Sequence, residues 1–322
     1  MKRVLLAPLE WGLGHASRSI ALARRLQAQG CEVVWAAEGD ARSLIAAEFP
    51  DCSFVDLTPS FRMRYSAGAS QVGAVLVALP RLVWSVWREH RDLSRVVRQY
   101  GIDEVISDNR FGLWCPLCPC AYLTHQLHVR LPRLARWLEP VVAALHRRII
   151  SKYDRCLVPD YADATRSLAG QLSHPRRLPN PLEYIGPLSR FGQLSPGSGG
   201  GVLLLLSGPE PQRSLFETAL LQRYRHSTQP VCLVRGTSHG PALPAELVQG
   251  VHVEDLLEGG RLAEKIAAAD LIECRSGYST VMDLAAAGKL SAARLTPTPG
   301  QPEQEYLAEH LQQHFHTVGP EV

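Results

Sequence analysis

The residues best suited to acid–base chemistry lie in a short loop near the amino terminus. This loop, Trp11-Gly12-Leu13-Gly14-His15-Ala16-Ser17-Arg18, separates a continuous apolar run at residues 3–9 from an amphipathic stretch that begins at residue 17. Gly12 and Gly14 would let a ligand approach the backbone closely, and His15 would stand at the start of a helix, where an imidazole tends to stay neutral and able to accept a proton. The third glycine of a dinucleotide-binding fingerprint is absent, since residue 17 is Ser. A helix cap with a hydrogen-bonded histidine is an equally open interpretation.

A second polar loop, Ser107-Asp108-Asn109-Arg110, comes at the end of residues 103–107, which predict a strand. In an open α/β sheet the carboxyl ends of the strands face the ligand, so Asp108 could orient His15 and stabilise its charged form, as in other pairs of a base and its orienting carboxylate. Asp is also a common turn residue, and Glu10 and His125 compete for the same role at this rim.

A third loop, Arg275-Ser276-Gly277-Tyr278-Ser279-Thr280, joins a predicted strand to a predicted helix. Its backbone N–H groups, its hydroxyls and the helix dipole would favour an anion, and with Arg275 they would suit a diphosphate without a metal. Asp283 falls one turn further along the helix, where it could bind a ribose hydroxyl. Ser207-Gly208-Pro209 offers another turn that could face phosphate. Many helices begin with Ser-Gly, so the argument depends on these features occurring together at one edge of one domain.

Alternating apolar and amphipathic segments predict the elements that would position these loops. Residues 1–160 alternate between strand and helix patterns, which indicates a doubly wound parallel sheet. Residues 160–200 are rich in Pro and Gly and are typical of a linker, and the alternation restarts at Val202. We therefore expect an α/β protein with two Rossmann-like domains, residues 1–185 and 186–322, facing each other across a ligand-binding cleft. The helical residues 72–100 are expected to break at Pro80.

Composition limits the classes of partner. The chain has 322 residues, 46% of them hydrophobic and 20% charged, enough for two ordinary cores. Residues 1–160 hold 21 Lys and Arg against 15 Asp and Glu, an excess that would suit anionic lipid or a phosphorylated substrate. The excess is too small and scattered to predict nucleic-acid binding. No secretory signal or run of 18 apolar residues is visible, so we expect a cytoplasmic protein whose eight cysteines are reduced.

One group of cysteines, Cys115-Pro116-Leu117-Cys118-Pro119-Cys120, has spacing that merits comparison with a zinc site. A fourth ligand would have to come from His125 or His128 nearby in the sequence. Cys120 is predicted to open a strand, which would point its side chain away from Cys118. The expectation is therefore a Pro-rich loop with buried thiols and no metal.

In their order and in their placement on two such domains, the three loops resemble those of the GT-B glycosyltransferases, over nearly the whole chain. The most specific stretches are residues 273–284 (Glu-Cys-Arg-Ser-Gly-Tyr-Ser-Thr-Val-Met-Asp-Leu) and 297–306 (Pro-Thr-Pro-Gly-Gln-Pro-Glu-Gln-Glu-Tyr). The nearest pattern is the bacterial branch related to the lipid II-forming N-acetylglucosaminyltransferase. The resemblance implies an inverting, metal-independent hexosyltransferase that uses a nucleotide sugar, with uracil as the base (a UDP-sugar), and no further cofactor. GT-B chains usually end in a helix that returns to the first domain. This sequence stops at Val322, soon after Phe315, so we expect either that the helix is missing or that the chain is truncated.

The resemblance also assigns roles to single residues. It places His15 near the acceptor, and we interpret His15 as the general base with Asp108 as its partner; Gly12, Gly14 and Arg18 would lie on the acceptor side. The donor site would lie in the second domain. It would comprise Ser207, Gly208, Arg275, Ser276, Gly277, Tyr278, Ser279 and Thr280 around the diphosphate, Asp283 at the ribose, Gln301 and Gln304 at the sugar, and Arg235-Gly236 and Val253-Glu254 beside the base.

The acceptor side is suggested by an unusually apolar segment, residues 72–87, which basic residues flank: Arg62, Arg64, Arg81, Arg88 and Arg91. In the lipid II-forming relatives an apolar patch with a basic rim on the first domain meets the membrane. A similar patch here would suit a lipid-linked acceptor and peripheral contact with the inner face of the membrane, while a saccharide acceptor stays open. The alternative interpretation is a buried core helix, which is apolar on most sides.

Three alternative functions share the fold or some of these motifs. Gly12, Gly14, His15 and Arg18 also match the Gly-x-Gly-His-x-x-Arg pattern of the GT-B-like hydrolase of pseudaminic acid synthesis, in which water replaces the acceptor. A nonhydrolysing epimerase shares the fold with less support. A catalytically silent protein that binds nucleotide sugars would keep the donor loop without using His15.

Overall fold

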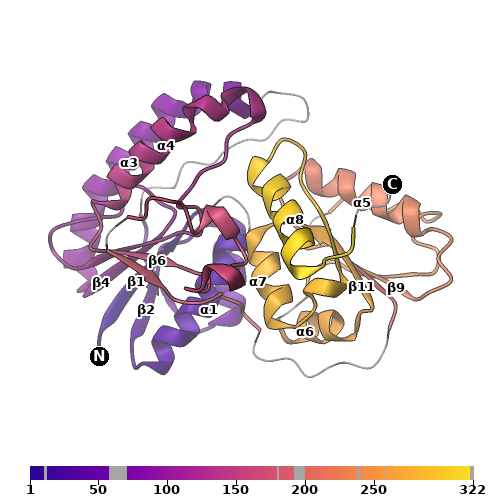
Figure 1. The fold of residues 1–322 in the computed structure, drawn as a ribbon. Coiled ribbons are helices and arrows are strands. Elements are labelled where there is room, and N and C mark those ends of the chain that lie inside the picture. The colour runs from indigo at the N-terminus through magenta and orange to yellow at the C-terminus, as the bar shows by residue number, and fades with distance from the viewer. Residues whose placement is uncertain are drawn as a thin grey trace. The chain divides into compact units, whose positions relative to one another are not determined.

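The computed structural model describes residues 1–10, 13–57, 71–179, 181–191, 200–237, 240–257 and 259–319, with the backbone alone for residues 71–79. Within this part the chain forms two compact units, divided between Leu188 and Ser189 (Figure 1). Each unit has its own parallel sheet. Among the described residues, every helix is too short or too polar to span a bilayer.

The first unit contains a seven-stranded parallel sheet in the order β3-β2-β1-β4-β5-β6-β7. The central strands β4 and β5 are buried along their whole length, and β1, β2 and β6 are buried after their first residue, as expected for a sheet that helices cover on both faces. The strands are β1 (Arg3–Pro8), β2 (Glu32–Trp35), β3 (Ser53–Phe54), β4 (Glu104–Asp108), β5 (Cys120–Leu123), β6 (Arg155–Val158) and β7 (Leu182–Tyr184).

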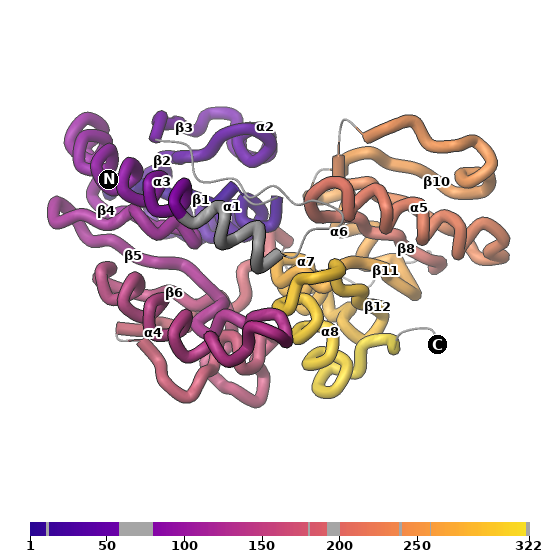
Figure 2. The backbone as a smooth tube through the Cα atoms, turned by 90° about the horizontal axis from the view of Figure 1, so that it is seen from above, coloured from indigo at the N-terminus to yellow at the C-terminus, as the bar shows by residue number. Residues whose placement is uncertain are grey.

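Helices cover both faces of this sheet. Figure 1 shows α3 and α4 on one face and α1 on the other, and Figure 2 shows α3 and α4 in front of the strands. Leu93 of α3 and Ile150 of α4 belong to the same core cluster as Leu5 and Tyr122 of the strands. The helices are α1 (Leu13–Ala28), α2 (Gly39–Glu48), α3 (Gln71–Tyr100) and α4 (Glu139–Ile150), with short 3-10 turns η1 (Arg133–Leu138), η2 (Ala164–Arg166) and η3 (Gly170–Leu172).

Two expectations for the first unit are wrong. Helix α3 continues through Pro80 instead of breaking there; Pro80 is exposed, so water can satisfy the backbone carbonyl that a proline leaves without its donor. The region expected to be only a linker contains β7, which pairs with β6 through Cys156 and Leu182. A strand of three residues is too short to show a hydrophobic period in the sequence.

The second unit contains a five-stranded parallel sheet in the order β10-β9-β8-β11-β12. On one face of the sheet, Phe216, Leu220 and Leu221 of α5 pack on Leu204 and Leu233. The strands are β8 (Val202–Leu205), β9 (Val231–Val234), β10 (Val251–Glu254), β11 (Leu271–Arg275) and β12 (Ala293–Thr296); the helices are α5 (Gln212–Tyr224), α6 (Gly259–Ala268), α7 (Tyr278–Ala286) and α8 (Pro302–Phe315), with the 3-10 turn η4 (Leu290–Ala292).

Both sheets reverse their strand order at one point, between β1 and β4 in the first unit and between β8 and β11 in the second. At such a switch point the connections leave the carboxyl ends of neighbouring strands in opposite directions and open a crevice that can bind a ligand. The predicted fold class, two doubly wound α/β domains, is confirmed. The loops predicted to bind ligand or transfer protons lie at these switch points: residues 107–110 and the described residues 13–18 of the amino-terminal loop in the first unit, and residues 207–209 and 275–280 in the second.

Candidate active site

The first switch point brings His15 and Asp108 together. Helix α1 begins at Leu13, so His15 lies in its first turn, and Asp108 is the last residue of β4, paired in register with Pro8 of β1. Nδ1 of His15 lies 3.0 Å from Oδ1 of Asp108. Asp108 is fully buried, whereas the His15 side chain keeps 18% of its surface exposed. A histidine with one nitrogen on a buried carboxylate and a partly open ring is suited to proton transfer.

Arg18 forms the centre of the hydrogen-bond network around this pair. Its side chain is 2% exposed and makes a two-point ion pair with Asp108: Nε donates to Oδ2 at 2.8 Å, and NH2 donates to Oδ1. The guanidinium also lies 2.8 Å from Nδ1 of His15 and 3.1 Å from Nδ1 of His125. The sequence interpretation put Arg18 on the acceptor side; in the structure its guanidinium is a buried partner of Asp108.

Ser19 is a member of the cluster that the sequence interpretation missed. Its hydroxyl donates to Oδ2 of Asp108 at 3.2 Å. His15, Arg18 and Ser19 are spaced at i, i+3 and i+4, which places them on one face of α1, and that spacing was the available signal. Of the two rivals named for the role of Asp108, His125 joins the network through Arg18.

The electrostatics favour a neutral base beside a permanent carboxylate. Burial alone would raise the pKa of Asp108, but the charges of Arg18 and His15 and their hydrogen bonds outweigh it and hold that pKa well below its ordinary value. Burial, followed by the Arg18 charge, lowers the pKa of His15 from 6.5 against the opposing effect of Asp108. Near neutral pH the imidazole is therefore uncharged and able to accept a proton.

The tautomer of His15 decides whether it can act as a base. Within the described part of the chain, both hydrogen-bonding contacts of His15 involve Nδ1. With its hydrogen on Nδ1, the ring donates to Asp108 and presents Nε2 as an acceptor. With its hydrogen on Nε2, the ring accepts from Arg18 at Nδ1 and offers no basic nitrogen to a substrate.

The glycines of this loop are only partly described. Gly14 lies inside the first turn of α1. Gly12 and its neighbour Trp11 fall outside the described residues.

The second switch point assembles the predicted diphosphate loops. Ser276 and Gly277 join β11 to α7, and Ser207 and Gly208 follow β8. Since β8 pairs with β11 through Leu205 and Cys274, the two loops leave neighbouring strand ends. Gly208 has φ +103°, a conformation that other residues rarely adopt. Tyr278, Ser279 and Thr280 form the first turn of α7, where the helix dipole favours negative charge.

Arg275 and Ser276 support this turn from behind. Arg275 donates to the carbonyls of Pro297 (2.8 Å) and Gln212 (3.3 Å) and stacks on Phe216, with 3.9 Å from the guanidinium carbon to the ring centroid. Burial lowers its pKa to about 10. Ser276 Oγ donates to the carbonyl of Gln304 at 2.8 Å. These bonds connect the end of β11 to α5 and α8.

The predicted sugar-binding glutamines contact each other. Gln301 precedes α8, and its Oε1 accepts from Nε2 of Gln304 at 2.6 Å. Oε1 of Gln304 accepts from the backbone N–H of Thr298 at 2.8 Å. The pair is therefore oriented by the turn after β12.

Asp283 and Arg235 bind other residues of their own unit. Asp283 is buried, accepts a hydrogen bond of 2.7 Å from Ser189 Oγ, and lies 3.9 Å from Nε of Arg190. Burial raises the pKa of Asp283 to about 6. Arg235 donates to both carboxylate oxygens of Glu217, at 2.6 and 3.2 Å, and to other acceptors nearby. A nucleotide contact by either side chain would have to coexist with these bonds.

The cysteine group differs from expectation. The sulfurs of Cys115, Cys118 and Cys120 lie within 4.8 Å of one another, so Cys120 does not point away from Cys118. Neither histidine considered as a fourth ligand is part of this group: His125 contacts Arg18, and His128 lies 3.2 Å from Glu139.

Comparison with solved structures identifies the fold. A UDP-glucosyltransferase from Polygonum tinctorium, 14% identical, aligns with 100% of this chain and 85% of its own with a TM-score of 0.65. The chain has the GT-B fold. No protein-family model matches it.

Two curated relatives extend the likeness to the sequence. An uncharacterized glycosyltransferase of Methanosarcina mazei is 23% identical over 91% of this chain and 79% of its own length. The UDP-N-acetylglucosamine–N-acetylmuramyl-(pentapeptide) pyrophosphoryl-undecaprenol N-acetylglucosamine transferase of Bordetella pertussis is 27% identical over 89% of this chain and 75% of its own. Together with the GT-B fold, these relatives support a glycosyltransferase assignment.

Proposed function

We propose that this protein transfers a hexosyl group from a UDP-sugar to an acceptor hydroxyl, with inversion and without a metal. The observation that carries the proposal is the buried Arg18–Asp108 ion pair that contacts Nδ1 of a partly exposed His15 at the first switch point. The relatives supply the class of reaction, because the Bordetella pertussis transferase uses a UDP-sugar donor.

The acceptor hydroxyl would be activated by His15. With its hydrogen on Nδ1 donated to Asp108, the ring takes the acceptor proton at Nε2 while the acceptor oxygen attacks the anomeric carbon. The bond from that carbon to the diphosphate oxygen breaks on the opposite face, which gives inversion. Asp108 stabilises the imidazolium that forms, and Arg18 keeps Asp108 ionised and fixed in position.

The departing diphosphate would be stabilised in the second unit. The first turn of α7 and the Ser207–Gly208 turn supply hydroxyls, backbone donors and the positive end of a helix dipole, and these can neutralise a diphosphate without a cation. The hydrogen-bonded pair Gln301 and Gln304 would contact the sugar. Asp283 would reach a ribose hydroxyl only by exchanging its bond with Ser189.

A lipid-linked acceptor is supported by an exposed apolar surface on the first unit. Residues 72–87 belong to helix α3, and the alternative interpretation made this segment a buried core helix. The described side chains contradict that alternative, since Trp84 and Trp87 are 57% and 55% exposed. Arg88 and Arg91 lie over the rings of these two tryptophans. Helix α4 packs on the same core cluster as α3, and η1 leads directly into α4. The apolar surface comprises Val83, Trp84, Trp87, Leu134, Trp137, Val141 and Leu145.

This surface has the composition of an interfacial contact. Exposed tryptophans beside arginines suit the boundary between lipid headgroups and acyl chains, where indole rings and cationic side chains are both stable. Exposed Arg133 and Arg136 flank Leu134 and Trp137 on η1. We therefore propose an acceptor carried on a lipid, reached by peripheral contact of this surface with an anionic membrane.

The test is to incubate the protein with a panel of UDP-sugars, with and without a membrane lipid extract, and to measure UDP release and radiolabelled sugar in the lipid phase. Release that depends on the extract, with label in lipid, supports the proposal. Replacement of His15 by Ala should abolish transfer and leave UDP-sugar binding nearly unchanged. Rapid UDP release in buffer alone would refute transfer in favour of hydrolysis.

A further inference from the structure

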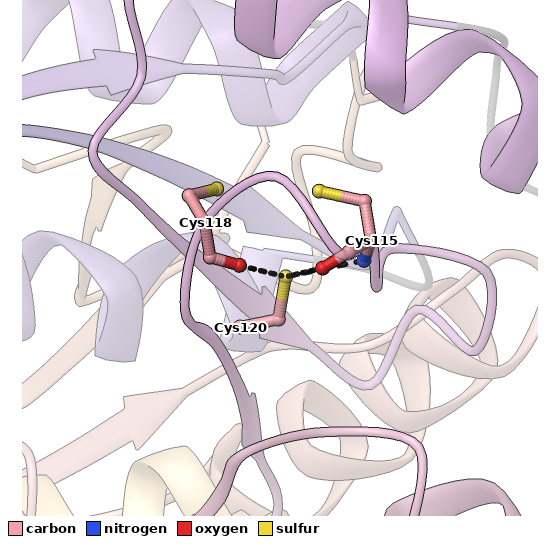
Figure 3. Close-up of side chains that lie close together, drawn as sticks. All are labelled: Cys115, Cys118 and Cys120. Atoms are coloured by element: carbon pink, nitrogen blue, oxygen red, sulfur yellow. Dashed lines mark hydrogen bonds between the residues drawn. The ribbon is translucent and has the colours of Figure 1, made fainter.

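Three cysteines of the first unit gather away from the proposed active site. Cys115 and Cys118 lie in the loop before β5, and Cys120 is the first residue of that strand. Their sulfur atoms all lie within 4.8 Å of one another. In Figure 3 the sulfurs of Cys115 and Cys118 point toward each other, with the sulfur of Cys120 between the two backbone segments.

Backbone hydrogen bonds hold this arrangement, and none of the three cysteines forms a disulfide. The N–H of Cys115 donates to Sγ of Cys120 at 3.3 Å, and that sulfur lies 3.4 Å from the carbonyl oxygen of Cys118. The N–H of Cys120 donates to Oδ2 of Asp154 at 2.8 Å, and β5 pairs Cys120 with Val105 of β4. The loop therefore presents three sulfurs in a fixed geometry.

The spacing of the sulfurs fits one tetrahedral ion. Zinc–sulfur bonds of about 2.3 Å place the sulfurs of a tetrahedral site about 3.8 Å apart. Two sulfurs at the 4.8 Å limit would therefore have to approach each other by about 1 Å when the ion binds. Rotation of the cysteine side chains can supply such a change. Cys118 is only partly buried and Pro116, Leu117 and Pro119 are exposed, so an ion can approach the group from solvent at Cys118.

Metal binding also sets the protonation of the thiols. A cysteine binds zinc as a thiolate, so a bound cation displaces the proton of each thiol that it contacts.

We propose that Cys115, Cys118 and Cys120 form a Zn²⁺ site in which three thiolates and one water hold the ion. Each thiol that binds as a thiolate gives its proton to solvent, and no electron transfer is involved. Soft thiolate ligands select zinc over magnesium or calcium, and iron–sulfur clusters commonly require a fourth cysteine ligand that this cluster does not include.

The position of the cluster points to a stabilising role. Cys120 lies at the amino end of β5, level with Val105, whereas Asp108 is level with Leu123 at the carboxyl end. Three residues of strand separate the two levels by about 10 Å. The ion would cross-link the loop to β5 at the sheet edge opposite His15, so it would stabilise the first unit without contacting the reacting groups.

The test is a zinc titration of the full chain, purified under reducing conditions and stripped with a chelator, in competition with a chromophoric chelator. The wild type should bind one equivalent. Cys118→Ser should bind at least about 100-fold more weakly, since loss of even an outer-shell partner of a zinc ligand costs 10- to 100-fold. Cys31→Ser, which removes a partly buried thiol elsewhere, is the matched control and should bind as the wild type does.

Cobalt provides a second readout that does not depend on a variant. The wild type loaded with Co²⁺ should show a sulfur-to-metal charge-transfer band, and Zn²⁺ should raise the Tm of the wild type and of Cys31→Ser but not of Cys118→Ser. Equal zinc affinity in wild type and Cys118→Ser, or Co²⁺ binding with no charge-transfer band, would overturn the proposal.

Discussion

Replacement of Asp108 by Asn is the sharpest test of the proposed base. Asn has nearly the same shape, but it removes the negative charge that faces Nδ1 of His15 at 3.0 Å. Arg18, whose NH2 lies 2.8 Å from the same nitrogen, then becomes its stronger partner. Donation from Arg18 favours the tautomer with hydrogen on Nε2, which cannot take a proton from the acceptor.

The size of the effect follows from the bond that is lost. A hydrogen bond to a charged group contributes about 1.5–3 kcal/mol, which corresponds to roughly a 10- to 150-fold loss of the competent tautomer. Loss of the stabilised imidazolium adds to this, so kcat should fall by about 10²- to 10⁴-fold in all. KM for the UDP-sugar should change little, because Asp108 does not lie among the donor residues.

The assay must separate chemistry from folding. Asp108→Asn leaves the 2%-exposed Arg18 without its counter-ion, and breaking a buried ion pair costs about 3–5 kcal/mol of stability. The double variant Arg18→Met/Asp108→Asn removes the unpaired charge and should recover stability but not activity. Ser19→Ala, which removes a bond to the other carboxylate oxygen, is the matched control and should lose less than about 10-fold. A folded Asp108→Asn enzyme within about 10-fold of wild-type kcat would refute the assigned role.

Three further predictions follow from the charges and surfaces of the two units. In a pH profile, kcat/KM should rise with pH through the pKa of His15, which burial and then Arg18 hold below 6.5; Arg18→Met should move that midpoint upward, and an unmoved midpoint would contradict the assignment. Burial raises the pKa of the Asp283 carboxyl from 3.8 to about 6, so the folded state binds the carboxyl proton more tightly than the unfolded state does. The protonated carboxyl therefore favours the folded state fully below about pH 4, and this contribution to the free energy of unfolding is lost as the pH rises through 6. Asp283→Asn should therefore raise the free energy of unfolding at pH 7 by up to about 3 kcal/mol and by little at pH 4, measured by urea unfolding; a variant less stable than wild type at pH 7 would contradict this. Trp137→Ser should reduce co-sedimentation with anionic lipid vesicles several-fold without changing Tm, whereas Leu215→Ser, at an exposed apolar position in the second unit, should have no effect; equal losses would mean that the apolar surface is not the contact.

The sequence predicted the strands of both sheets other than β7, because most of them are apolar runs that helices and turn residues separate. The contact of His15 with Asp108 was also predictable, since both lie at the carboxyl ends of strands and the carboxyl ends of parallel strands share one edge of the sheet. A very short strand and a helix that continues through a proline were not predictable. β7 has three residues, and the continuity of α3 through Pro80 depends on that residue being exposed.

Arg18 shows what the sequence could not supply. Its spacing from His15 indicated a shared helix face, but the sequence does not reveal whether a long side chain on that face points to solvent, to a substrate or inward. Burial of Asp108 settles the direction here, because a buried carboxylate needs a counter-charge and only the inward guanidinium provides two parallel bonds to it. The same ion pair places an Arg donor beside Nδ1 of His15, so the group that keeps Asp108 ionised also competes for the tautomer on which catalysis would depend.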